Sequence, residues 1–245
     1  MSQPLIHLHG IDWTQAGRCR LRIADLTIHA GEKVAILGRN GAGKSSLLKL
    51  INGFASPDRG HVQVGGQSVF PVPSAQRLRQ LRRKVGQVPQ GLHLVSRLSV
   101  QDNVLVGGLA AMPLFRSCLR VFTPAELQAA EQAMAAVGVL HLRQVRADRL
   151  SGGERQKVAI ARLLIQAPEV VLADEPTAAL DPTAASEVIE LLRAATRQTT
   201  LLTVVHQVDQ VPLLADRVLG LRAGELVLDC PSQSLNTSLL GDLYG

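Results

Sequence analysis

Short apolar runs separated by glycines and polar residues recur along the chain and predict an alternation of strands and helices. Residues 34–37, 170–173 and 201–205 are almost uninterrupted apolar stretches, which is typical of strands buried on both faces of a parallel sheet. Residues 5–28 instead alternate apolar and polar positions on either side of a turn, which indicates an antiparallel pair of strands. The pattern therefore predicts an α/β fold.

The middle of the chain has a different character. Two prolines interrupt it, and Thr123-Pro124 is a good helix start, because threonine caps a helix and proline fits its first position. Apolar residues then recur at three- and four-residue steps. We predict a single domain, residues 1–245. Its core, residues 1–90 and 150–245, combines a mostly parallel sheet with an antiparallel β subdomain, and a helical subdomain is inserted at about residues 91–149.

A glycine-rich loop follows the first buried strand directly. Its residues, Gly38-Arg39-Asn40-Gly41-Ala42-Gly43-Lys44-Ser45, fit G-x-x-x-x-G-K-S without a gap, and Ser46 begins a leucine-rich segment that predicts a helix. In this setting the backbone N–H groups converge on a phosphate, helped by the helix N-terminus. Lys44 supplies charge to the β- and γ-phosphates, and the Ser45 hydroxyl is a ligand for Mg²⁺. The loop predicts a phosphate site for Mg²⁺ and a nucleoside triphosphate.

Polar residues follow three of the predicted strands. Asp174 and Glu175 come after residues 170–173, His206 after the next apolar strand, and Gln90 after a strand that ends at residue 88. The carboxyl ends of parallel strands are where such sheets place ligands. We expect Asp174 to hold Mg²⁺ and Glu175 to act as general base or water positioner. Gln90 orients a water or contacts Mg²⁺, or is an ordinary loop residue; His206 contacts the γ-phosphate or the water, or is a satisfied core histidine.

A second glycine-containing helix start occurs at Ser151-Gly152-Gly153. By the same physics it is a second anion site. One triphosphate hardly needs two such sites on the same face, so the second is expected to serve a nucleotide held by another copy of the chain. Trp13, the only tryptophan, stacks on the base or fills a surface gap; we favour stacking.

Composition limits the remaining possibilities. The chain carries a net charge of +6, which is compatible with nucleic acid or with an anionic membrane face. Its densest basic segment, residues 77–84, contains leucines at helical spacing and no aromatic residues. This pattern predicts a solvated helix face rather than a surface that stacks on bases. No signal peptide or membrane-spanning run is recognisable, which predicts a cytosolic chain. The three cysteines lack ligand spacing, so no metal beyond Mg²⁺ is expected.

Two longer motifs together resemble one family. Residues 150–156, L-S-G-G-E-R-Q, followed by residues 170–181, V-V-L-A-D-E-P-T-A-A-L-D, are similar to the ATP-binding subunits of ABC transporters, and the resemblance covers nearly the whole chain. It implies a P-loop NTPase core with an antiparallel β subdomain and an inserted helical subdomain, and a homodimer that sandwiches two ATP molecules. Trp13 approximately matches the family's base-stacking aromatic.

The resemblance also implies roles for residues at matching positions. Gln90 would sense Mg²⁺ and the membrane partner, and Ser151-Gly152-Gly153 would touch the γ-phosphate bound by the partner subunit. Asp181 would form the loop that crosses the dimer. Glu175 would be the catalytic base and His206 the switch histidine.

Less specific sequence similarities favour the phosphonate-import ATPases within that family. They lie in residues 115–117, 205–209, 215–225 and 243–245. They imply a peripheral subunit on the cytoplasmic face of the inner membrane, with integral-membrane permease subunits, an indirect periplasmic solute-binding protein and no nucleic acid. The transported solute would be a phosphonate, phosphite or hypophosphite. An importer ATPase for an amino acid or another oxyanion remains an alternative, as does a soluble mechanical ATPase acting on DNA or the ribosome. A small-molecule kinase would leave Ser151-Gly152-Gly153 without a role.

Overall fold

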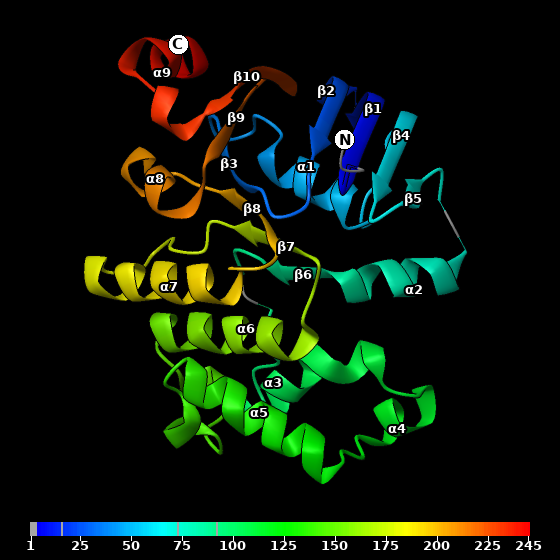
Figure 1. Cartoon of the computed structure of the whole chain (residues 1–245), viewed down its shortest axis with the longest axis vertical. Helices are drawn as coiled ribbons and strands as arrows, with labels where there is room; N and C mark the ends of the chain where they lie inside the picture. The colour runs from blue at the N-terminus through cyan, green and yellow to red at the C-terminus, as the bar shows by residue number, and fades with distance from the viewer. Residues whose placement is uncertain (1–3, 16, 73, 92) are drawn as a thin grey trace.

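The computed structural model describes residues 4–15, 17–72, 74–91 and 93–245. Within these residues one ten-stranded sheet has the order β5-β4-β1-β2-β10-β9-β3-β8-β7-β6 (Figure 1). The strands are β1 Ile6–Gln15, β2 Arg18–Ile28, β3 Lys33–Leu37, β4 Arg59–Val64, β5 Gln67–Phe70, β6 Val85–Val88, β7 Val170–Asp174, β8 Thr200–Val204, β9 Arg217–Arg222 and β10 Glu225–Pro231.

One half of the sheet is parallel. Strand β3 pairs in parallel with β8 and β9, and the parallel order continues from β8 through β7 to β6. Every residue of β8 is buried, as are four of the five residues of β3 and of β7. The apolar runs predicted these strands because a strand covered on both faces has no solvent side on which to place polar residues. Their carboxyl ends lie at a common edge of the sheet.

The other half is antiparallel. Strand β1 pairs with β2 on one side and β4 on the other, and β4 continues to β5. In β1, Ile6, Leu8 and Ile11 are buried, while His9 points outward, which explains the alternating sequence. Strand β10 connects the halves, because it pairs with β9 and meets β2 at one position, Glu225 opposite Arg22. The predicted fold class, a mostly parallel core with an antiparallel β part, is confirmed.

The helices divide between the two halves. In Figure 1, α3, α4 and α5 lie at the end of the molecule away from β1, β2 and β4, with α6 and α7 between them and the sheet. All named elements between β6 and α6 are helical. The helices are α1 Lys44–Ile51, α2 Ala75–Lys84, α3 Val100–Leu105, η1 Val106–Ala111, α4 Leu114–Leu119, α5 Pro124–Ala136, η2 Leu140–Leu142, η3 Ala147–Arg149, α6 Gly152–Gln166, α7 Pro182–Ala195, η4 Val208–Gln210, α8 Val211–Leu214, η5 Ser232–Ser234 and α9 Thr237–Tyr244.

Two of these helices begin with the same reciprocal cap. In α5, the Glu126 backbone N–H donates to Oγ1 of Thr123 across 3.2 Å, and the Thr123 N–H donates to Oε2 of Glu126 across 2.7 Å. Ser151 and Glu154 repeat this arrangement at the start of α6. Such caps satisfy backbone donors that the first turn leaves unpaired and stabilise a helix by about 1 kcal/mol. They fix where both helices start.

Candidate nucleotide-binding and hydrolysis site

The glycine-rich loop between β3 and α1 has a backbone path that other residues could not follow. Gly38 has φ of 144° and Gly43 has φ of 107°. A Cβ on Gly38 would lie 2.2 Å from the carbonyl oxygen of Leu221, and one on Gly43 would lie 2.8 Å from that of Arg20. Glycine therefore lets the loop curl directly against β9 and β2. This is the strand, loop and helix arrangement that the motif predicts.

Lys44 lies beneath this loop and is almost fully buried, with 6% of its surface exposed. Its Nζ donates hydrogen bonds to the carbonyl oxygens of Gly38, across 2.6 Å, and Arg39, across 3.0 Å. Burial lowers the pKa of Lys44, and the nearby carboxylates of Glu175 and Asp174 oppose that shift. The ammonium group is thus held against two carbonyl groups at the start of the loop.

The loop and the strand ends meet in one pocket of about 390 Å³. It has a polar lining of cations, amides, hydroxyls and a carboxylate. Its residues are Arg20, Asn40, Gly41, Gly43, Lys44, Ser45, Ser46, Gln90, Glu175 and His206. Gly38, Arg39 and Ala42 belong to the loop but do not line this pocket. Ala42 is buried and its carbonyl accepts from the N–H of Gly224, while the exposed Arg39 donates to the carbonyl of Tyr244. Five separate segments of the sequence therefore line one cavity.

Glu175 is held by two of these segments. One carboxylate oxygen accepts a hydrogen bond from Nε2 of Gln90 across 2.7 Å, and the other lies 2.6 Å from Nε2 of His206. The Glu175 side chain is 14% exposed, whereas that of His206 is 45% exposed. The Glu175 backbone has φ of +53°, an uncommon conformation for a residue other than glycine, and its N–H donates to the carbonyl of Val204. This turn directs the carboxylate into the pocket.

Asp174 fits the role of a cation ligand. Its Oδ1 is buried, and no described residue provides it with a hydrogen-bond partner. Burial raises the pKa of Asp174, and a hydrogen bond from the side chain of Ser45 opposes this. A buried carboxylate oxygen without a partner is costly, and Mg²⁺ prefers oxygen ligands of this kind. Asp174 and Ser45 thus offer a carboxylate and a hydroxyl at one place beside the loop.

The second predicted phosphate-binding segment does not line this pocket. Ser151, Gly152 and Gly153 start α6, and Asp181 caps α7 by accepting from the N–H groups of residues 183 and 184. The two helix starts are neighbours: a Cβ on Gly152 would lie 3.3 Å from the side chain of Leu180. The structure thus brings Ser151-Gly152-Gly153 and Asp181 together, on a surface separate from this pocket.

Trp13 and Arg20 lie at the antiparallel side of the pocket. Trp13 is half-buried against the apolar cluster of this side and does not line the pocket. It is paired across the strands with Leu21, whose side chain approaches Gly43. Arg20 does line the pocket, and its buried Nε has no partner among the described residues. The sequence did not single out Arg20, because it is one arginine among several in an alternating strand and belongs to no motif.

A buried lysine beneath a glycine loop, facing a carboxylate, an amide and an imidazole at the ends of parallel strands, defines the site of a P-loop nucleoside triphosphatase. The profile of the ABC transporter family matches residues 21–178. The chain belongs to the ABC transporter family, and its structure is that of the ATPase class within it. This confirms the resemblance carried by residues 150–156 and 170–181.

Curated relatives match over nearly the whole chain. "Phosphonates import ATP-binding protein PhnC 2" of Pseudomonas syringae pv. syringae is 43% identical, covering 98% of this chain and 89% of its own length. "Phosphonates import ATP-binding protein PhnC" of Cupriavidus pinatubonensis is 44% identical, covering 92% of this chain and 83% of its own. "Phosphonates import ATP-binding protein PhnC 3" of Halalkalibacterium halodurans is 39% identical, covering 92% and 88%.

Solved structures agree on the fold. A dimeric post-hydrolysis state of the ATP-binding cassette MJ0796, bound to ADP and Pi, superposes with a TM-score of 0.80 at 26% identity, covering 94% of this chain and 100% of that one. The cbiO1 subunit of Clostridium perfringens, part of the ABC transporter complex cbiONQ, superposes with a TM-score of 0.80 at 27% identity, covering 98% and 92%.

Proposed function

We propose that this chain is the ATP-hydrolysing subunit of an importer for phosphonate or a reduced phosphorus oxyanion such as phosphite or hypophosphite. The observation that supports the ATPase part is the placement of Glu175, held by Gln90 and His206, in the same pocket as Lys44. The names of the relatives, which are about 40% identical over more than nine tenths of the chain, support the phosphonate part.

Hydrolysis at this site is phosphoryl transfer to water. The loop N–H groups and Lys44 hold the β- and γ-phosphates, and Glu175 takes the proton of a water that attacks the γ-phosphorus. The bond between that phosphorus and the β–γ bridging oxygen breaks, and ADP carries the leaving oxygen. His206 contacts the γ-phosphate oxygens and also holds the carboxylate of Glu175. Asp174, Ser45 and Gln90 would hold Mg²⁺, which would supply positive charge to the phosphates.

The chain completes its site as a homodimer. Ser151-Gly152-Gly153 and Asp181 form one surface that does not reach the pocket of their own chain. The exposed start of α6 offers unpaired N–H groups and the positive end of a helix, which suit the γ-phosphate on a facing subunit. The related cassette MJ0796 is dimeric when bound to ADP and Pi. ATP would favour the closed pair, and loss of the γ-phosphate would release it.

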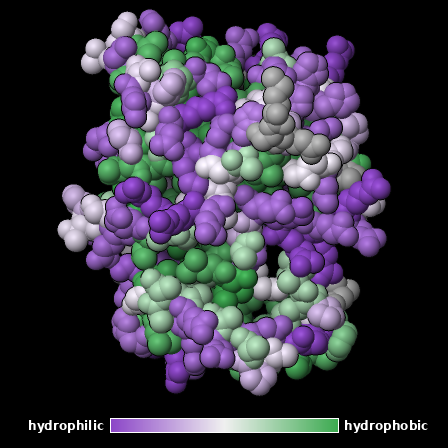
Figure 2. Space-filling view, viewed as in Figure 1, coloured by the Kyte–Doolittle hydropathy of each residue, from purple (hydrophilic) through white to green (hydrophobic). Residues whose placement is uncertain are grey.

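The helical segment, residues 91–149, is the part that we assign as a separate subdomain and as the contact for the permease. A groove of about 550 Å³ lies among α3, α4, α5 and α6 and has a largely apolar lining. Phe115, Leu119 and Val121 are 54–72% exposed nearby. Figure 2 shows hydrophobic residues gathered over the helices in the lower half of this face. Exposed apolar surface of this kind suits a protein partner.

The proposed location is the cytoplasmic face of the inner membrane, with integral-membrane permease subunits as direct partners and a periplasmic solute-binding protein as an indirect one. Among the described helices, none has the length and apolar character needed to cross a membrane. Nucleic acid is not an expected partner, because the arginines of α2 lie on a largely exposed helix face without aromatic residues between them.

Uptake in a strain lacking this chain tests the proposal. Growth is measured with phosphonate, phosphite or phosphate as sole phosphorus source, and the strain is complemented with the wild-type chain or with Glu175→Gln. We expect growth on phosphonate or phosphite to require the wild-type chain and to fail with Glu175→Gln, while growth on phosphate is unaffected. Normal growth of the deletion strain on all three would rule out the phosphorus substrate and favour an importer ATPase for another solute.

A further inference from the structure

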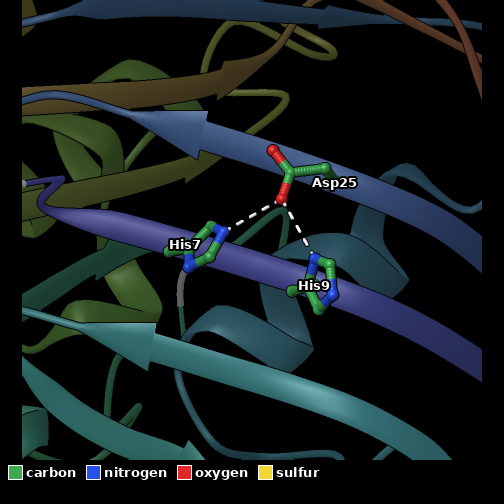
Figure 3. A group of neighbouring side chains, drawn as sticks. All are labelled: His7, His9 and Asp25. Atoms are coloured by element: carbon green, nitrogen blue, oxygen red, sulfur yellow. Dashed lines mark hydrogen bonds and ion pairs between the residues drawn. The ribbon is translucent and has the colours of Figure 1, made fainter.

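Three side chains converge on the outer face of the antiparallel strands, away from the nucleotide pocket. His7 and His9 lie on β1 and Asp25 lies on β2 (Figure 3). Nε2 of His7 is 3.0 Å from Oδ1 of Asp25, and Nδ1 of His9 is 3.2 Å from the same oxygen. One potential ligand atom from each residue falls within 4.8 Å of the other two. Two imidazoles therefore share one carboxylate oxygen.

The strand register places these groups together. Side chains two residues apart on a strand share a face, so His7 and His9 point outward while Leu8 between them is buried. His9 is directly opposite Asp25 on β2 and directly opposite His61 on β4. His61 is exposed, and cross-strand partners lie on the same face. A third imidazole thus borders the cluster from the other side of β1.

We propose that His7, His9 and Asp25 form a binding site for a divalent transition metal, with Zn²⁺ as the preferred biological ion and His61 as the fourth ligand. Imidazole nitrogens together with a carboxylate oxygen suit zinc, whereas Mg²⁺ and Ca²⁺ prefer sites built from oxygen. The set of three nitrogens and one oxygen has the number of ligands that a tetrahedral zinc site needs.

The distances among His7, His9 and Asp25 agree with such a site, whereas the ligand atoms of His61 lie outside this group and would reach the ion by side-chain rotation. Ligand atoms about 2.0–2.1 Å from a tetrahedral ion are separated from one another by roughly 3.3 Å. The two nitrogen-to-oxygen distances, 3.0 and 3.2 Å, are within a few tenths of that value. The side chains of His9 and Asp25 are 63% and 57% exposed, so small rotations can direct their lone pairs to a common point. An ion there would cross-link β1 to β2 and, through His61, to β4.

The site is distinct from the nucleotide pocket. None of the four residues lines that pocket. His9 precedes Trp13 by four residues, a separation of about 13 Å along an extended strand. Bound metal would therefore act on the antiparallel strands, and its expected effect is to stabilise them, because an ion that binds the folded chain in preference to the unfolded chain raises its stability.

Zinc binding by the untagged chain tests this proposal. Equilibrium dialysis without nucleotide gives the number of bound ions and their affinity for the wild type, for the His7→Gln/His9→Gln double variant, for Asp25→Asn and for His61→Gln. Each change is expected to raise the dissociation constant of one bound equivalent of zinc by about tenfold or more. His141→Gln removes an exposed histidine from the helical segment and should leave that equivalent intact.

Two further measurements separate this site from the His206–Glu175 pair, which also joins an imidazole to a carboxylate. Co²⁺ should give the absorption of a tetrahedral nitrogen and oxygen site, and the double variant should lose it. Zinc should raise the melting temperature of the wild type but not that of the double variant, whose metal-free melting temperature should match the wild type. Zinc affinity and stoichiometry unchanged in the double variant would overturn the site, and unchanged affinity in His61→Gln would overturn the fourth ligand.

Discussion

Oε1 of Glu175 lies 2.6 Å from Nε2 of His206, and the two residues follow the neighbouring parallel strands β7 and β8. The other oxygen of Glu175 accepts from Gln90, which follows β6. Three strand ends thus fix the direction of one carboxylate beside the glycine loop. A group that activates water must be positioned before its proton affinity matters, and this arrangement provides the positioning.

Glu175→Gln tests that role. The amide keeps the size of the side chain and can still contact Gln90 and His206, but it is a poor proton acceptor. We expect hydrolysis to slow by about 100-fold or more, the range for loss of a general base, while the dissociation constant for ATP stays within about twofold. Single-turnover hydrolysis and ATP titration measure the two quantities. Near wild-type hydrolysis would contradict the assignment of Glu175.

Lys44→Ala removes the buried cation beneath the loop. Hydrogen bonds from a charged group to phosphate contribute about 1.5–3 kcal/mol, which corresponds to a loss of roughly 10- to 150-fold in ATP affinity. Lys49→Ala is the matched control, because Lys49 lies on the same helix with its side chain exposed. ATP titrations of both variants provide the comparison. Equal affinities for the wild type and Lys44→Ala would contradict the phosphate-binding role of the loop.

Asp174→Asn should stabilise the metal-free chain and weaken its use of Mg²⁺. Because burial raises the pKa of Asp174 above 3.8, ionising this group costs stability in the folded state. The wild type therefore loses stability relative to the variant as pH rises from 3.8 through the raised pKa, and the difference is constant above it. Denaturant unfolding over a pH series, without Mg²⁺, measures this difference.

The same variant should need a higher Mg²⁺ concentration for half-maximal hydrolysis, because an amide oxygen is a weaker ligand than a carboxylate. A variant that is less stable than the wild type at neutral pH, with an unchanged Mg²⁺ requirement, would show that Asp174 has a structural role instead.

Trp13 stays a prediction as the base-stacking residue, and a pair of ligands tests it. Stacking on an aromatic ring contributes about 1–3 kcal/mol per base, so Trp13→Ala should weaken ATP binding by roughly fivefold or more. It should leave inorganic tripolyphosphate, which has no base, unaffected, and Trp13→Phe should retain most of the ATP affinity. Equal weakening of both ligands by Trp13→Ala would mean that the substitution disturbs the loop through the packing of Leu21.

The sequence predicts the parallel core well for a physical reason. Strands covered on both faces must be apolar throughout. Residues 34–37, 170–173 and 201–205 can therefore be recognised as buried strands from the local sequence, without knowing which strands they pair with. The starts of α5 and α6 can also be predicted from nearby residues, because Thr123 and Ser151 are capping residues. The pairing of β10 with β2 at Glu225 and Arg22 has no such local signal, since these two residues are 203 positions apart.

The candidate site divides in the same way. Motifs identify the glycine loop, Asp174, Glu175 and the second helix start, because each has a fixed local spacing. Arg20 and the cluster of His7, His9 and Asp25 depend on strand register, which places Arg20 beside Gly43 and Asp25 opposite His9. The expectation that no metal beyond Mg²⁺ would be bound relied on cysteine spacing, which carries no information about this histidine pair.

Hydrolysis by Ser151→Arg, with the molar mass followed by light scattering, tests the composite site most directly. Thr123→Arg is the control, because it removes the equivalent cap of α5, which is not one of the segments proposed to face the partner subunit. The shared site predicts that Ser151→Arg still binds ATP through Lys44, stays monomeric when ATP is added and loses at least about 100-fold in hydrolysis, while Thr123→Arg dimerises and hydrolyses normally. Hydrolysis at the wild-type rate by a monomeric Ser151→Arg chain would contradict the account.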